Sequence, residues 1–543
     1  MFRKIMIFAL AAVMLFTAGC AKKDDPQTTT ASGTQTTAPA SEGFDLSGCR
    51  IVNSISQPSA LRQAAINLQT YISKNSGIKP EIVADSTGTD DSAVEIIIGE
   101  TSRAQSAEAM NLLASAGYTG GAVIAKIGNK LVINGSSNET TLIAVKRFMN
   151  NGILNCGDGK VSCDVGSGIV FDLSGEIISA PGSRFFRIET KTVVYQPTKE
   201  NPDVTLTYPR VVVLEHNGEN NGQILVTGES LNEDAYIIHR STDGGKTFEI
   251  LSRIKADRSG MVANWQPFIY ELPCAVGGLP EGTLLFSGCV RDRSTSSRTE
   301  IVVWKSTDLG ASWQTLSTVA TAGGIDKGVW EPFLYAENGK LYCFYSDDAD
   351  PVCSQTIVLK VSEDGINWGD QIQVTACADA NLRPGMASVT KMGNGEYFIT
   401  YEMVGMDGNI VHYKKTKDLT DWGNVKENGT VLSAGGVSIG SAPYCAWTPA
   451  GGENGTLIVT AHNMAGGSSS TGTEWLISYD YGRSFKSIRN PLPYTLGDKH
   501  RYAYSPGLFV AGDGSVYYVN DINCEEKRFK DKASITLAHI IIE

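Results

Sequence analysis

The sequence repeats one pattern six times over its second two-thirds. Each copy begins with a proline-led apolar run, turns, and continues into a second apolar run, which predicts a β-hairpin. The copies begin 52 to 65 residues apart, and regular self-similarity of this kind indicates a repeat architecture. Their prolines are Pro209, Pro267, Pro332, Pro384, Pro443 and Pro506. We therefore expect a series of similar β units.

Five of the six copies continue into a further strand and a turn of one type. The turns read "STDGGKTF" from Ser241, "STDLGASW" from Ser306, "SEDGINW" from Ser362, "TKDLTDW" from Thr416 and "SYDYGRSF" from Ser478. They resemble the Asp-box of sialidase-like propellers, although the third and fourth are one residue short and the fourth lacks the glycine. The aspartate can accept backbone N–H groups of its turn while the aromatic residue packs beneath. We expect a structural role for these turns.

Six repeats of four short strands predict a mainly β fold, a six-bladed β-propeller over residues 185–543. The last repeat has only "ITLAHIIIE" after its hairpin. We expect the earlier strands "FFRIET" and "KTVVYQ" to complete that blade and close the ring. Closure would remove the exposed sheet edges that otherwise invite aggregation.

Residues 1–20 have a basic start, a short apolar core and small residues before Cys20, which is typical of a secretory signal and too short to span a bilayer. The ending "FTAGC" resembles the bacterial lipobox, which implies cleavage before Cys20 and a lipid on its sulfur. A plain signal peptide is the alternative. Residues 21–43 are rich in Thr, Ser and Pro and predict a linker. We expect an extracytoplasmic protein attached to the membrane by an N-terminal lipid anchor.

Residues 44–180 predict a small α/β domain. An amphipathic helix runs from Ser59 to a stop at Gly77, and a second follows in "NETTLIAVKRFMNNG". Apolar runs such as "CRIVNSI", "AVEIIIGE" and "KLVINGS" predict strands. The pattern resembles the small domain that precedes the catalytic domain in hexosaminidases and α-glucuronidases, which implies a carbohydrate context.

The net charge of −12 argues against a nucleic-acid partner, since phosphate binding needs a basic surface. The six histidines show no metal-ligand spacing, so we expect no metal and no cofactor. Disulfide connectivity stays open; Cys343 with Cys353 and Cys156 with Cys163 are the nearest pairs in sequence. We expect a monomer.

Glu331 is the unusual residue of the repeats, because it lies between Trp330 and Pro332 where a buried strand begins. An isolated carboxylate there is costly unless the protein uses it. In a propeller, first strands start and second strands end on one rim. Before the prolines that rim offers Tyr208, Gln266, Glu331, Arg383, Ala442 and Ser505, and at the second-strand ends it offers Glu229, Cys289, Asp347, Glu402, His462 and Asp521.

Carboxylates, arginines and aromatic rings around one opening suit a sugar. The predicted substrate-binding residues are Arg210, Trp265, Gln266, Trp330, Asp347 and Arg383. The alternative for each charged residue is that it solvates a loop or pairs with a neighbouring arginine.

The stretches "VWEPFLYAENGKLYCFYSDD" and "RPGMASVTKMGNGEYFITYE" look like the corresponding blades of exo-α-1,5-L-arabinanases, retaining glycoside hydrolases on a sialidase-type propeller. The resemblance implies that Glu331 and Glu402 are the catalytic pair and that Tyr504 is the active-site tyrosine, with Tyr502 as a rival by spacing. Because Glu331 is flanked by apolar residues, we expect a raised pKa and the role of acid/base, which leaves Glu402 as the nucleophile.

Two other functions fit parts of the pattern. A sialidase would use three arginines, for which Arg210, Arg383 and Arg501 are candidates, but no arginine follows "TYE" in "MVGMDGNIVHYKK". A non-catalytic glycan-binding lipoprotein could share the fold, since propellers serve many functions. It would have no need of two carboxylates at the separation that retaining hydrolysis requires.

Overall fold

The structure is a computed structural model that describes residues 43–88, 91–199, 206–230, 232–293, 298–376, 379–465, 471–495, 504–524 and 532–543. Cys20, the signal segment and residues 21–42 of the predicted linker lie outside these ranges, so the lipid anchor stays a prediction. Within the described ranges, no helix is long and apolar enough to cross a membrane.

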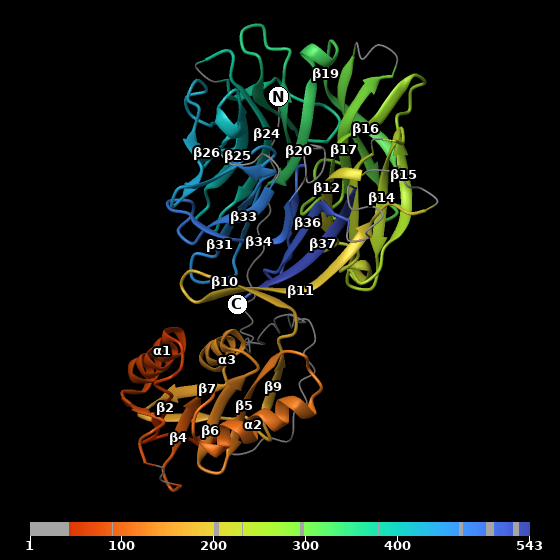
Figure 1. Cartoon of the computed structure of the whole chain (residues 1–543). Coiled ribbons are helices and arrows are strands. Elements are labelled where there is room, and N and C mark those ends of the chain that lie inside the picture. Colours follow the sequence, from red (N-terminus) through yellow and green to blue (C-terminus); the bar gives the residue numbers. More distant parts are fainter. Residues whose placement is uncertain are drawn as a thin grey trace, which may run out of the picture.

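Residues 44–172 form a six-stranded sheet with helices on both faces (Figure 1). The strand order is β3-β2-β4-β6-β5-β9, in which β2, β3, β4 and β6 run parallel. The strands are β2 (Arg50–Asn53), β3 (Glu81–Ala84), β4 (Glu95–Ile98), β5 (Gly121–Ile127), β6 (Lys130–Gly135) and β9 (Ile169–Asp172). A second sheet contains β1 (Phe44–Asp45), β8 (Lys160–Cys163) and β7 (Leu154–Gly157).

The helices of this unit are α1 (Ser59–Ser76), α2 (Ala104–Ser115) and α3 (Asn138–Asn150). The stop at Gly77 is confirmed, since Gly77 is left-handed and its N–H bonds to the oxygen of Ser73. Helix α3 starts at a capping box formed by Ser137 and Thr140. The sequence analysis missed α2, which has no side-chain cap and few buried residues to give it a periodic pattern.

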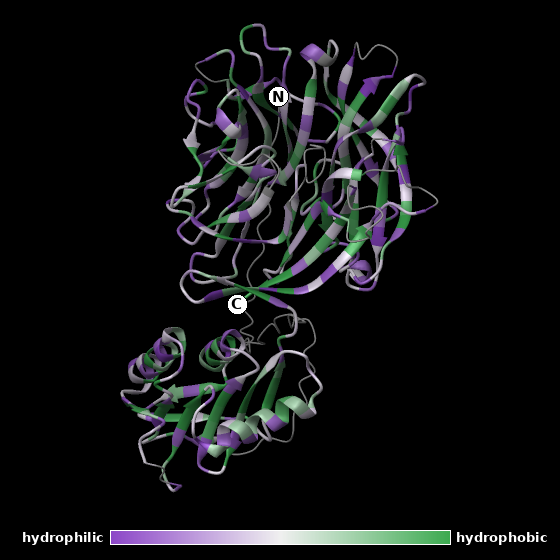
Figure 2. Cartoon of the chain, viewed as in Figure 1, coloured by the Kyte–Doolittle hydropathy of each residue, from purple (hydrophilic) through white to green (hydrophobic). Residues whose placement is uncertain are grey.

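The remaining described chain forms antiparallel sheets, and four of these use consecutive strands. The first three are β12 (Leu206–Val213), β13 (Ile224–Ser230), β14 (Ala235–Ser241) and β15 (Glu249–Lys255); β16 (Met261–Glu271), β17 (Leu284–Asp292), β18 (Thr299–Ser306) and β19 (Gln314–Ala322); and β20 (Val329–Glu337), β21 (Lys340–Asp347), β22 (Thr356–Ser362) and β23 (Ile372–Thr375). Figure 2 shows hydrophobic residues concentrated along these strands.

Two more four-stranded sheets follow. They are β24 (Arg383–Lys391), β25 (Tyr397–Val404), β26 (Val411–Thr416) and β27 (Thr430–Val431); and β30 (Tyr444–Thr448), β31 (Thr456–Thr460), β33 (Thr471–Ser478) and β34 (Lys486–Thr495). A small sheet of β28 (Ser433–Ala434), β29 (Val437–Gly440) and β32 (Asn463–Met464) lies between them in sequence. Short 3₁₀ turns occur at Gly218–Asn220, Ile325–Lys327 and Asp407–Asn409.

The last sheet joins strands from both ends of this region. Its order is β10 (Glu176–Ala180), β11 (Arg184–Tyr195), β37 (Ala533–Ile542), β36 (Val516–Asn523) and β35 (Gly507–Val510). The two strands expected at "FFRIET" and "KTVVYQ" are one strand, β11, with register shifts at Ile188/Thr190 and Val193/Tyr195. Strand β10 pairs with β11, so residues 176–180 belong to this sheet although the sequence analysis assigned them to the small domain.

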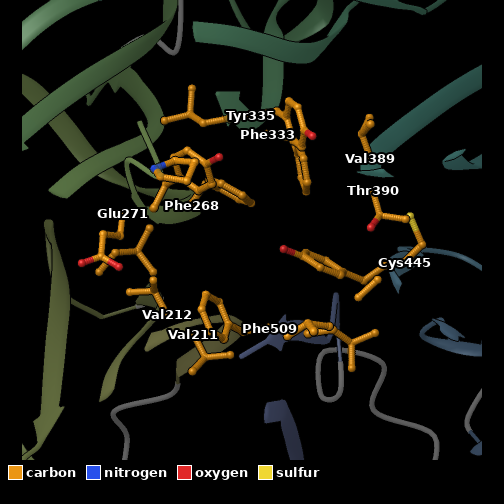
Figure 3. A pocket seen from close by; sticks show the side chains of 18 of the residues that line it. Val211, Val212, Phe268, Glu271, Phe333, Tyr335, Val389, Thr390, Cys445 and Phe509 are labelled. Carbon is orange, nitrogen blue, oxygen red and sulfur yellow. The ribbon is translucent and has the colours of Figure 1, made fainter. Parts of the chain in front are cut away.

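One strand from each of these six sheets lines a central cavity of about 240 Å³ (Figure 3). The six are β12, β16, β20, β24, β30 and β35. Aromatic and branched side chains such as Phe268, Phe333 and Phe509 surround the space (Figure 3). The six sheets therefore share one axis, as in a propeller.

The aspartate turns stabilise their own loops. At the turn after β33, Oδ1 of Asp480 accepts hydrogen bonds from the backbone N–H groups of Arg483 (3.1 Å) and Ser484 (2.9 Å). The hydroxyl of Ser484 donates to Oδ2 (2.6 Å). Equivalent bonds surround Asp243 and Asp308. The carboxylates are thereby occupied within their turns.

Glu543 connects the two units. Its N and O atoms pair with Phe185 (2.8 and 3.0 Å), and its carboxylate contacts Arg147 of helix α3. The Nζ of Lys146 also donates to the oxygen of Glu543 (3.1 Å). Phe185 itself packs in the hydrophobic core of the small unit. These contacts tie helix α3 to the closing sheet.

Candidate active site

Each strand nearest the axis carries a left-handed residue close to its start. The six, all non-glycine, are Tyr208, Gln266, Glu331, Met386, Ala442 and Ser505, with φ of 53°, 54°, 64°, 56°, 44° and 60°. Bulges interrupt the pairing of β12, β16, β20 and β24 at these points. Such conformations are strained and cluster at functional sites. In the fourth sheet the left-handed residue is Met386, so Arg383 does not occupy the position that the sequence analysis gave it.

Glu331 is held by three donors from neighbouring strands. Its Oε2 accepts a hydrogen bond from the hydroxyl of Ser346 (2.6 Å) and another from the backbone N–H of Met386 (2.8 Å). Its Oε1 lies 3.4 Å from Nε2 of Gln266. The carboxyl group is partly buried and points from β20 across to β24.

Glu402 lies on the strand next to the one that Glu331 contacts. It is 6% exposed, and its Oε2 accepts hydrogen bonds from the hydroxyl of Ser441 and the N–H of Ala442 (both 2.8 Å). Its cross-strand partner is Gly385, and Cβ atoms of such partners lie about 4.5–5.5 Å apart on one side of the sheet. A Cβ on Gly385 would lie 3.4 Å from Oε2 of Glu331. The charge of Glu402 acts on Glu331, so the two carboxyl groups lie near each other.

The pair has the electrostatics of an acid and a base. Burial, and then the negative charge of Glu402, raise the pKa of Glu331 to about 7. Burial also raises the pKa of Glu402, but the N–H of Ala442 and the hydroxyl of Ser441 oppose that rise. With a pKa of about 7, the Glu331 carboxyl group is partly protonated near neutral pH. The hydrogen bonds from Ala442 and Ser441 both go to Oε2 of Glu402.

Tyr504 lies within range of the charges of both carboxylates, and its predicted role in the site stays a prediction. Burial and then the charges of Glu402 and Glu331 raise its pKa well above the usual value. Its ring lies 6.2 Å from that of Tyr208 and 5.4 Å from that of His462, measured between centroids. Its rival Tyr502 lies outside the described residues.

Trp265 and Trp330, which directly precede Gln266 and Glu331, pack against each other. Their ring centroids are 5.9 Å apart, and the guanidinium of Arg291 lies 4.4 Å from the centre of Trp265. Arg291 was not among the predicted residues, and it covers part of the Trp265 ring. The Nε1 of Trp330 donates to Oδ2 of Asp348 (3.1 Å), which also accepts from Arg383 (3.1 Å).

Asp347 does not face this rim. Its Oδ2 accepts a hydrogen bond from Gln371 (3.0 Å) and its Oδ1 accepts one from the N–H of Ala349 (2.8 Å). Side chains alternate along a strand, so Ser346 and Asp348 point to the side of the sheet that Asp347 avoids. Both contact the site, through Glu331 and Trp330 respectively. The sequence analysis missed Ser346 and Asp348, which strand alternation in "YSDD" could have identified.

The guanidinium group of Arg210 is bonded to neighbouring protein atoms. It is 6% exposed, and its guanidinium donates to the backbone oxygen and the hydroxyl of Ser505 (both 2.8 Å) and to the oxygen of Pro209 (2.8 Å). It also stacks against Tyr208 and Tyr444, at 4.2 and 5.1 Å from the ring centres. These contacts give no support to the predicted role in substrate binding.

The cysteines that the structure describes are all unpaired, so neither Cys343–Cys353 nor Cys156–Cys163 is bridged. Within the described ranges, no cluster of three or more His, Cys, Asp or Glu residues could hold a metal ion.

No family model matches the sequence, and no curated protein matches it. Among solved structures, an α-L-arabinanase of Penicillium chrysogenum, complexed with arabinobiose, is 30% identical, with a TM-score of 0.56. The match covers 65% of this chain and 98% of that chain. The chain belongs to the family of this arabinanase.

A GH93 α-L-arabinofuranosidase of Fusarium graminearum, also with arabinobiose, is 28% identical with a TM-score of 0.55, and the match covers 64% of this chain and 97% of that one. A glutamate-to-alanine variant of an α-L-arabinofuranosidase from the same organism, with an iminosugar inhibitor, gives the same identity, coverage and TM-score. The family relation supports a propeller-like glycoside hydrolase. It gives no support to the expected likeness between residues 44–180 and hexosaminidase domains.

Proposed function

We propose that this protein is a retaining, exo-acting glycoside hydrolase that cleaves arabinan-type polysaccharide outside the cytoplasm. Glu331 is the acid/base, Glu402 is the nucleophile, and Tyr504 supports the pair. The substrate is a glycan bound on the rim near Trp265, Trp330 and Arg383. Hydrolysis of this kind needs no metal or cofactor.

The reaction follows from two carboxyl groups in different states. Glu331, protonated near neutral pH, donates its proton to the leaving glycosidic oxygen while Oε1 of Glu402 attacks the anomeric carbon. Glu331 then removes a proton from water, which hydrolyses the glycosyl–enzyme intermediate. The developing positive charge of the sugar is stabilised by the carboxylate of Glu402.

The observation that carries the proposal is the position of Gly385. This residue is the cross-strand partner of Glu402 and lies against the Glu331 carboxylate. Retaining enzymes hold their two carboxyl groups about 5–5.5 Å apart, and the effect of the Glu402 charge on the pKa of Glu331 supports a short separation here. A side chain on residue 385 would also collide with Gln355, so glycine keeps this space open.

The test is hydrolysis of linear α-1,5-arabinan by the soluble part of the chain, with the configuration of the first product followed by proton NMR. Release of short arabinose products with retained anomeric configuration supports the proposal. Inverted product refutes the retaining mechanism. Cleavage of a sialic acid glycoside in place of arabinan identifies a sialidase, and glycan binding without any hydrolysis identifies a non-catalytic receptor.

We also infer that the six sheets are the blades of a closed six-bladed propeller spanning residues 185–543, with residues 176–180 as an added edge strand and residues 44–172 as a separate α/β domain. One strand from each sheet around the central cavity supports this division. We infer further that a lipid on Cys20 anchors the enzyme to the membrane and that residues 21–43 link it to this anchor. The enzyme acts as a monomer. Metabolic labelling with a fatty acid, lost in Cys20→Ala, tests the anchor.

A further inference from the structure

Cys289 lies beneath the active site although nothing in the proposed reaction uses it. This residue of β17 is 1% exposed. Its thiol donates to Oε1 of Gln266 at a distance of 3.0 Å between Sγ and the oxygen. The backbone oxygen of Val329 is a second, more distant neighbour at 3.7 Å. A buried thiol has few reasons to face a side-chain amide, so the contact with Gln266 calls for a role.

The amide of Gln266 has one favourable orientation. Its oxygen accepts from the thiol of Cys289 and also from the backbone N–H of Glu331 (3.1 Å). A flipped amide would point its NH₂ group at both of these donors. With the oxygen fixed in this way, Nε2 faces Oε1 of Glu331 at 3.4 Å. The N–H of Gln266 is itself bound by Oε2 of Glu229 (3.1 Å), which anchors the backbone.

The geometry points to Oε1 as the atom of Glu331 that carries the catalytic proton. Oε2 already accepts from Met386 and Ser346, and a backbone N–H can only donate. Oε1 faces Gln266, whose NH₂ group also only donates and therefore favours the ionised carboxylate. The orientation of one amide thus acts on the proton that the enzyme transfers.

We propose that Cys289 and Gln266 are a positioning pair that orients the Glu331 carboxyl group and sets the pH range in which the enzyme turns over. The inference rests on the proposed function, since it assigns Glu331 as the acid/base. The other titratable groups that act on Glu331 are Glu402 of β25, Asp348 after β21, Tyr208 of β12 and Tyr504 before β35.

The test compares the pH profile of kcat/KM for the wild type, Cys289→Ala, Cys289→Ser and Gln266→Ala. Loss of the amide donor favours the protonated acid, so Cys289→Ala and Gln266→Ala should move the alkaline limb upward by about 0.3–0.5 pH unit. Cys289→Ser keeps a hydrogen-bond donor at this position and should restore the wild-type alkaline limb. The double variant should shift no further than Gln266→Ala, because the thiol acts through the amide.

Cys343→Ala is the matched control, because it removes another fully buried thiol from the adjacent sheet, where Sγ faces the backbone oxygen of Phe344 (3.8 Å). The inference would be overturned if Cys289→Ala and Cys343→Ala had the same alkaline limb in their pH profiles of kcat/KM. It would also be overturned if Cys289→Ser did not restore the wild-type alkaline limb. If the wild type hydrolyses no glycoside, the proposed function fails on its own. In that case the positioning pair is tested without activity, by infrared titration of the Glu331 carboxyl group, whose band is the one lost in Glu331→Gln. The midpoint of that titration should shift upward in Cys289→Ala and Gln266→Ala by the same amount as predicted for the alkaline limb.

Discussion

Glu331→Gln should make the protein more stable at alkaline pH and have little effect at acid pH. The pKa of Glu331 rises from 4.5 in the unfolded chain to about 7 in the folded protein. A carboxyl group with a raised pKa stabilises the fold below pH 4.5 relative to its ionised form, and that contribution is lost as pH rises through 7. At about 1.36 kcal/mol per pKa unit, ionisation at this site costs about 3 kcal/mol above pH 7.5.

Glutamine removes this cost because it has no charge to desolvate, and its amide oxygen can still accept from Ser346 and Met386. Urea unfolding at pH 4.5, 6 and 8 measures the difference in free energy of unfolding between the variant and the wild type. We expect the difference to grow by about 3 kcal/mol between pH 4.5 and pH 8. Glu219→Gln, at an exposed position, is the control and should show no such growth. A difference that stays constant over this range would refute the raised pKa.

Three further substitutions separate roles within the site and the scaffold. Glu402→Gln should reduce turnover by at least about a thousandfold on every substrate, whereas Glu331→Gln should keep more activity on aryl glycosides whose leaving group needs no proton; equal losses on both substrates would reverse or remove the assignment. Tyr504→Phe should lower kcat by roughly 10- to 100-fold, since a hydrogen bond to a charged group contributes about 1.5–3 kcal/mol, and an unchanged kcat excludes a role for the hydroxyl. Asp480→Ala should lower the free energy of unfolding by about 1–2 kcal/mol through lost turn bonds, with kcat/KM unchanged; a loss of kcat/KM in the folded protein would make this turn functional.

The repeats could be found in the sequence because the same local chemistry recurs in each. A proline-led apolar run, a turn and a second run predict a hairpin at every copy, and the observed strands β12, β16, β20 and β24 each contain or begin at such a run. What the pattern did not contain was the length of β11, since β11 pairs with β37 between residues more than 300 positions apart. Local sequence carries little information about such partners.

The site could be found in outline but not in its contacts. Glu331 and Glu402 stand out because each is a carboxylate at the end of an apolar run. The choice of Asp347 over Asp348 followed the end of the strand, which the structure also has at Asp347. It is Asp348 that contacts Trp330, because neighbouring residues point to opposite sides of the sheet. Similarly, the left-handed residue of the fourth sheet is Met386, two positions after Pro384, whereas in the other five copies it directly precedes the proline.

The strained residues explain why this fold can hold two carboxylates so close together. Strand β24 is the first strand of its sheet and pairs with a neighbour on one side only. The left-handed turn at Met386 releases one N–H, which donates to Glu331, and the turn at Ala442 releases another, which donates to Glu402. Each such conformation costs about 1–3 kcal/mol, and the charge-assisted hydrogen bond that it permits returns a comparable amount. The N–H of a left-handed residue thus binds both carboxylates, and in the second sheet the N–H of Gln266 donates to Glu229 in the same way.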